Sequence, residues 1–197
     1  SDGDKIQDVS YDLIAGHRRQ KACELAGLDS MPVIVMNLDD NDAIIQMVES
    51  NIQRENILPS ERAKAYKMKL DAIKQQGARH DLTSVQPGQK LVRKSSRDLI
   101  AENSPDSSTQ IQRYIRLTEL EPQLLQMVDE GKIGMTPAVE LSYLTDAEQR
   151  DFLQAMEASK HPPSLSQAQR ITRLSRAGEC RYDAMLDVMK NAQLDRL

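Results

Sequence analysis

The sequence contains few aromatic residues and almost no cysteine. Aromatic residues make up 3% of its 197 residues, against 39% for all hydrophobic residues. The core therefore has to be aliphatic, with nine Met residues available to fill gaps. The two cysteines, Cys23 and Cys180, have neither the spacing of metal ligands nor the number that a disulfide framework needs. We expect a reduced cytoplasmic protein.

Several other features are missing. No apolar run approaches the roughly 20 residues of a membrane-spanning helix, and no membrane partner is expected. The first ten residues lack the apolar centre of a signal peptide and read like the middle of a domain, which predicts a fragment. There is no nucleophile elbow, Walker loop or metalloprotease motif, and the three histidines lie far apart. We predict no catalytic residue.

The charge is uneven along the chain. The net charge is −4, which argues against a wholly basic nucleic-acid-binding surface. Residues 90–116, however, contain six basic and three acidic residues, a local charge of +3. Such a segment is typical of a phosphate-binding surface, although an ordinary solvated surface explains a single charge run as well.

Residues 95–120, SSRDLIAENSPDSSTQIQRYIRLTEL, are predicted to form two short helices joined by a tight turn. Serines at 95 or 96 and at 107 or 108 can cap them, and Pro105 ends the first. Apolar residues of the second follow at i, i+3, i+4 and i+6 from Ile111, which leaves a polar face. This pattern is typical of a helix-turn-helix, whose second helix enters the DNA major groove. An ordinary pair of antiparallel helices explains the spacing equally well.

The rest of the chain predicts a mostly α-helical protein with a small α/β lobe at its start. Strands are expected at 11–15 and 31–38 around a helix that stops at Gly27, and helices at 39–54 and 60–76. Later helices are expected at 121–130, 136–144 and 182–194, with capping boxes at Thr145 and Ser166. The predicted domains are an N-terminal lobe (1–76), a linker rich in Gly, Pro, Ser and Thr (77–94), a helix-turn-helix domain (95–178) and a C-terminal helix (179–197).

Two polar stretches of the N-terminal lobe could bind an anion. In GHRR, residues 16–19, a glycine permits close backbone approach and two arginines follow at a helix start. In ESNIQREN, residues 49–56, amide and guanidinium groups lie at the end of a helix. Each stretch alone is also explained as a polar helix end with a purely structural role.

Taken in order, these stretches resemble the ParB partition-protein family over about residues 11–175. GHRR resembles its G-E-R-R box, SNIQREN-ILP its E-N-x-Q-R-x-x-L-x-P box, and SERAKAYKMKL the helix that follows. The helix-turn-helix and GKIGMTPAVELSYL resemble the DNA-binding lobe of the family. The fold implied is a ParB/sulfiredoxin-like N-terminal lobe followed by an all-helical domain.

The resemblance implies a protein of chromosome, plasmid or mobile-element partitioning that works in the cytoplasm on the nucleoid. Its implied partners are double-stranded DNA with a palindromic site, a second copy of the chain and a ParA-type ATPase. CTP with Mg²⁺ would close the dimer into a DNA clamp. The implied nucleotide-binding residues are Gly16, Arg18, Arg19, Asn51, Gln53 and Arg54, with Asn51 at the metal, and the implied DNA contacts are Ser95, Arg97, Ser108, Thr109, Gln110, Arg113, Arg116 and Thr136.

Three departures from the family pattern bear on the nucleotide. His17 and Ser50 stand where the family has glutamates, and neither replaces a carboxylate well as a Mg²⁺ ligand. The opening strands of the family's N-terminal lobe are not matched. The sequence therefore leaves three hypotheses open: a CTP-gated DNA clamp, a weak CTPase, and a nucleotide-independent helix-turn-helix transcription regulator.

Overall fold

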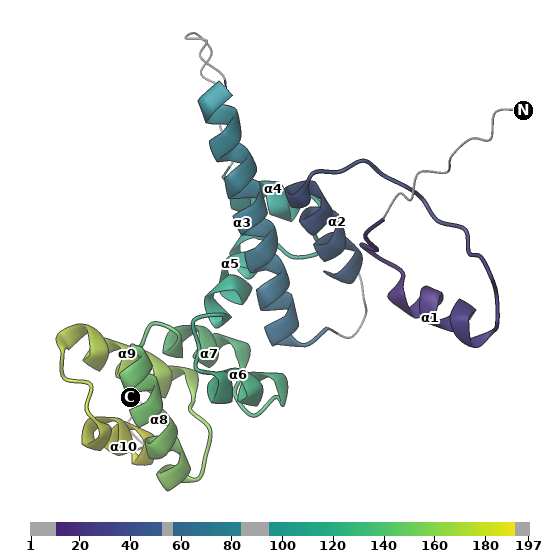
Figure 1. Ribbon diagram of the computed structural model, residues 1–197. Coiled ribbons are helices and arrows are strands. Elements are labelled where there is room, and N and C mark those ends of the chain that lie inside the picture. The colour runs from purple at the N-terminus through teal and green to yellow at the C-terminus, as the bar shows by residue number, and fades with distance from the viewer. Residues whose placement is uncertain (1–10, 53–56, 84–94, 192–197) are drawn as a thin grey trace, which may run out of the picture.

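The computed structural model describes residues 11–52, 57–83 and 95–191, and within these ranges the regular structure is entirely helical (Figure 1). The prediction of a mostly α fold is confirmed. The strands predicted at 11–15 and 31–38 are wrong, because these segments have no neighbouring strand among the described residues to complete a hydrogen-bonded ladder. In chain order the helices are α1 (His17–Leu25), α2 (Asp40–Ile52), α3 (Pro59–Thr83), α4 (Ser96–Glu102), α5 (Ser108–Leu117), α6 (Pro122–Asp129), α7 (Met135–Leu141), α8 (Asp146–Ser159), α9 (Leu165–Ala177) and α10 (Tyr182–Lys190).

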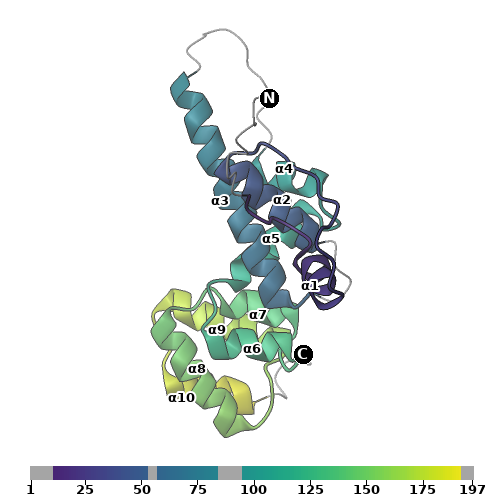
Figure 2. The same cartoon turned by 45° about the vertical axis from the view of Figure 1, so that its right-hand side comes forward.

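The long helix α3 is the axis of the first half of the molecule. Helices α2, α4 and α5 pack against it (Figures 1 and 2). Their shared core is a small cluster of buried side chains from all four helices: Val48, Ile52, Tyr66, Ile100 and Ile111. This packing fixes the orientation of α4 and α5 relative to α2.

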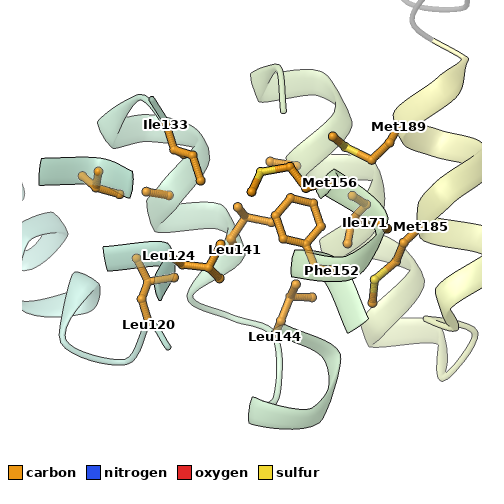
Figure 3. Close-up of a cluster of buried hydrophobic side chains, with 14 of the residues drawn as sticks. Leu120, Leu124, Ile133, Leu141, Leu144, Phe152, Met156, Ile171, Met185 and Met189 are labelled. Carbon is orange, nitrogen blue, oxygen red and sulfur yellow. The ribbon is translucent and has the colours of Figure 1, made fainter. Parts of the chain in front are cut away.

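A second and larger core fills the C-terminal half. Figure 3 shows Phe152 of α8 surrounded by aliphatic and Met side chains of α6, α7, α9 and α10. Ala63 of α3 belongs to this cluster too, so α3 reaches both cores. The cluster confirms the predicted aliphatic and Met-rich interior. Its labelled members are Leu120, Leu124, Ile133, Leu141, Leu144, Phe152, Met156, Ile171, Met185 and Met189.

Helix boundaries follow the capping signals with two exceptions. The capping box of Thr145 with Glu148 is present, as predicted. The box predicted at Ser166 is wrong, because Ser164 caps α9 and pairs with Gln167 instead. Helix α7 begins at Met135 with Gly134 as its N-cap, one residue before the predicted start at 136.

Helix α3 is longer than the sequence predicts. The predicted linker begins at residue 77, but the helix continues to Thr83. One glycine in a long helix costs only about 1 kcal/mol, which the packing of the preceding turns offsets. The rest of the predicted linker, 84–94, and the end of the predicted last helix, 192–194, lie outside the described residues.

The packing predicts a contrast between two leucines. Leu141 is fully buried in the C-terminal core, whereas Leu165 is 40% exposed at the start of α9. Leu141→Ala should lower the free energy of unfolding by about 2–5 kcal/mol because it leaves a cavity, and Leu165→Ala by less than about 1 kcal/mol. Urea denaturation followed by circular dichroism measures both, and equal losses would contradict this placement of the core.

Candidate functional site

Helices α4 and α5 and the turn between them form the unit in which the sequence predicted DNA contacts. Ser95 caps α4, its hydroxyl accepting from the Asp98 amide at 3.3 Å. Ser107 caps α5 in the same way, accepting from the Gln110 amide at 3.3 Å. Capping fixes where each helix begins. The predicted arrangement of two short helices around residues 103–107 is therefore present.

The turn is anchored to α3 through Asp106. The Asp106 carboxylate accepts a hydrogen bond of 2.6 Å from the Tyr66 hydroxyl and pairs with Arg62 Nη1 at 3.2 Å. The Arg62 guanidinium also lies 5.4 Å from the centre of the Tyr114 ring, which belongs to α5. Burial raises the pKa of Tyr66 above its ordinary value, and the hydrogen bond to Asp106 raises it further. Tyr66 therefore stays a neutral hydrogen-bond donor.

The solvent-facing side of α5 carries groups that can bind nucleic acid. Thr109, Gln112 and Arg113 are exposed, and Ser108 and Gln110 are half-buried in its first turn. Hydroxyl, amide and guanidinium groups are those that contact base edges and phosphates. Beside this face lies a hollow of about 360 Å³ between α3, α4 and α5, and its polar lining comes from Lys74, Ser95, Ser96, Arg97 and Gln112.

Two of the predicted DNA contacts lie near α7. Thr136 is exposed in the first turn of α7. Arg116, at the end of α5, donates from Nε to the Ser142 hydroxyl at 3.0 Å, and it stacks on the Tyr143 ring at 4.2 Å. Ser142 and Tyr143 were not predicted from the sequence, because no periodic pattern relates Arg116 to a residue 26 positions further along the chain. Their only signal was a tyrosine in a chain poor in aromatic residues.

The predicted nucleotide-binding residues that the structure describes lie at two helices, α1 and α2, that do not contact each other through hydrogen bonds or ion pairs among the described residues. Gly16 has the left-handed conformation (φ of 100°) that favours glycine and precedes α1, in whose first turn Arg18 and Arg19 are exposed. Asn51 is half-buried on α2. Helix α1 buries no residue. Gln53 and Arg54 lie outside the described residues.

The acidic residue nearest to Asn51 in the sequence already has a cationic partner. Lys69, only 2% exposed, donates from Nζ to Glu49 Oε1 at 2.6 Å and ties α2 to α3. Ser50 donates its hydroxyl to the Met47 carbonyl. No cluster of three acidic, His or Cys residues suited to a metal occurs within the described ranges. The described residues thus offer separate anion-binding groups but no assembled nucleotide or Mg²⁺ site.

The two cysteines, Cys23 and Cys180, are free. Burial, with smaller contributions from the charges of Glu148 and Asp151, raises the pKa of the Cys180 thiol to about 12. A thiol with this pKa is a poor nucleophile at neutral pH. None of the described helices is both long and apolar enough to cross a membrane.

The anchor at Asp106 predicts a measurable loss of stability. Asp106→Ala leaves the mostly buried Arg62 and the Tyr66 hydroxyl without their acceptor, and should lower the free energy of unfolding by about 2–4 kcal/mol. The control is Glu119→Ala, which removes an exposed ion pair with Lys67 and should cost about 0–1 kcal/mol. Urea denaturation measures both, and a loss at Asp106 no larger than that at Glu119 would contradict the anchor.

Comparison with known proteins gives one consistent result. Residues 4–52 match the family model of the ParB N-terminal domain. Stage 0 sporulation protein J of Bacillus subtilis is 32% identical over 127 residues, which are 64% of this chain and 37% of that protein. A probable chromosome-partitioning protein ParB of Treponema pallidum is 30% identical over 143 residues, 73% of this chain and 38% of that protein. The chain thus spans less than half the length of these two relatives.

A solved structure extends the similarity to the fold. It is the crystal structure of the C-terminally truncated chromosome-partitioning protein ParB from Caulobacter crescentus, complexed to the centromeric parS site. The TM-score is 0.51 at 21% sequence identity, covering 82% of this chain and 73% of that chain. At this identity the comparison shows the fold alone. The family model, the curated relatives and the fold thus agree that this chain is similar to the ParB partition proteins.

Proposed function

We propose that this chain binds double-stranded DNA in a sequence-specific way and acts in the partitioning of a chromosome, plasmid or mobile element. The observation that carries the proposal is the α4–turn–α5 unit, which is anchored to α3 and exposes Thr109, Gln112 and Arg113 on one side. The ParB of similar fold was crystallised with its centromeric parS site, and the Treponema pallidum relative is named a probable chromosome-partitioning protein.

The electrostatics of the turn suit an approach to DNA. Asp106 precedes α5 by two residues and would otherwise place a negative charge beside the helix start that faces phosphate. Arg62 and Tyr66 bind that carboxylate from the α3 side, so its charge is paired. The first turn of α5 contains no acidic residue. The Gln110 backbone amide is bound by the Ser107 cap, whereas the side chains of Thr109 and Gln110 in the same turn can contact DNA.

We also propose that the active form is a homodimer on two half-sites. Two-fold symmetry of the protein mirrors a palindromic site when each copy presents one reading helix. A ParA-type ATPase is a further proposed partner, on the family resemblance alone.

The reading face predicts a loss of sequence preference on substitution. Gln110→Ala combined with Arg113→Ala should lower the ratio of specific to non-specific affinity by at least about 30-fold, because each of the two base contacts contributes roughly 1–3 kcal/mol of discrimination. The matched control is Arg150→Ala with Gln154→Ala, an exposed pair on α8, which should leave the ratio unchanged. Fluorescence anisotropy with a duplex selected from a randomised library, and with its scrambled version, measures the ratio. Retention of full preference by the double variant would contradict the proposal.

Nucleotide gating is the finer part of the proposal. We propose that CTP with Mg²⁺ binds through Gly16, Arg18, Arg19, Asn51, Gln53 and Arg54, and that binding favours a clamp on DNA. Two exposed guanidiniums at the start of α1 support an anion site there. Turnover of CTP would be weak, since His17 and Ser50 supply no carboxylate. The pairing of Glu49 with Lys69 favours the alternative, a nucleotide-independent transcription regulator.

Calorimetric titration of the full-length protein with CTP and Mg²⁺, with and without DNA, separates these alternatives. We expect binding in the micromolar range that Arg18→Ala with Arg19→Ala weakens at least tenfold. Lys21→Ala is the control, because Lys21 lies on α1 but is paired with Glu24. If the wild-type protein binds DNA but no CTP, the gating proposal is wrong and the regulator is favoured.

A further inference from the structure

The C-terminal end of α5 carries a preformed cationic surface that involves two residues outside this helix. Arg116 binds Ser142 twice, through Nε to its hydroxyl at 3.0 Å and through Nη2 to its carbonyl oxygen at 2.5 Å. Its guanidinium carbon lies 4.2 Å from the centre of the Tyr143 ring. The side chain of Arg116 is therefore held from two directions.

Ser142 is the fixed part of this arrangement. It is buried at the end of α7, and its hydroxyl donates to the Val139 carbonyl at 2.7 Å while accepting from Arg116. The two bonds to Ser142 use two of the five N–H groups of a guanidinium. Among the described residues, no other partner of Arg116 occurs. The charge and the remaining donors are thus available to an anion.

Tyr143 completes the surface. It is 47% exposed, its ring is fixed against Arg116, and its hydroxyl has no hydrogen bond to the described part of the chain. By contrast, the buried Tyr66 hydroxyl is bound to Asp106. An exposed tyrosine with a restrained ring loses little conformational entropy when its hydroxyl binds a partner.

The position of this surface indicates what it binds. Thr109, Arg113 and Arg116 are spaced at i, i+4 and i+7 and lie on one face of α5. A reading helix directs its N-terminal residues at base edges, so its far end lies near the sugar–phosphate backbone at the edge of the groove. Resting on the DNA-binding function proposed above, we infer that Tyr143 and Arg116, positioned by Ser142, form a contact to a DNA backbone phosphate.

A phosphate contact has a signature that differs from base reading. Tyr143→Phe removes only a hydroxyl, and should weaken binding to a library-selected duplex and to its scrambled version by the same factor, about three- to tenfold. Arg116→Gln should weaken both duplexes and also lower the slope of log affinity against log salt by about 1, whereas Tyr143→Phe leaves this slope unchanged. Ser142→Ala should lower the affinity for both duplexes, because it removes the hydroxyl that accepts the hydrogen bond from Arg116 Nε.

The controls separate this contact from a purely structural role. Tyr11→Phe alters an exposed tyrosine far along the chain from α5 and should change nothing. Tyr143→Phe should unfold at the same urea concentration as the wild type, since it removes no internal hydrogen bond. Wild-type affinity of Tyr143→Phe for both duplexes, beside loss of preference in the Gln110→Ala and Arg113→Ala variant, would overturn this inference alone. Absence of any DNA binding by the wild-type protein would overturn the proposed function with it.

Discussion

The contact on which this structure most depends joins the Asp106 carboxylate to Arg62 and Tyr66. The turn at residues 103–107 cannot by itself fix the angle between α4 and α5, because its backbone makes few hydrogen bonds of its own. Binding Asp106 to two side chains one turn apart on α3 supplies that constraint. Because Tyr66 also lies in the smaller core, the polar anchor and the apolar packing position α5 together.

Helix α3 also contacts α2 on one side and the C-terminal half of the chain on the other. Lys69 binds Glu49 and ties the end of α2 to the middle of α3, while Ala63 packs into the C-terminal core. The Ser60 amide donates to Asp129 of α6 at 2.9 Å, which joins the start of α3 to the second half of the chain. Helix α3 thus contacts both the helix that contains Asn51, through Lys69, and the turn before α5, through Tyr66.

Local sequence patterns predicted the helices well and the N-terminal lobe poorly. Serine caps and apolar periods need only neighbouring residues, so α4, α5, α8 and α10 begin at or within a residue of the predicted positions. The apolar segment 31–38 has the composition of a strand, yet Ile34 is 89% exposed. A strand forms only beside neighbouring strands, and the sequence of the segment itself does not show whether they are present. The candidate DNA-binding face was predicted from α5 itself. Its supports were not, since Arg62–Asp106 and Arg116–Ser142 join residues 44 and 26 positions apart.

The most direct test of the account is whether α5 touches DNA. A photoreactive amino acid would be placed at Thr109 on α5 or at Gln154 on α8, both exposed, and each protein irradiated with a duplex selected from a randomised library. We predict a cross-link from position 109 that competitor duplex of the same sequence abolishes, and none from position 154. A cross-link from position 154 alone would contradict the claim that α5 is the reading helix.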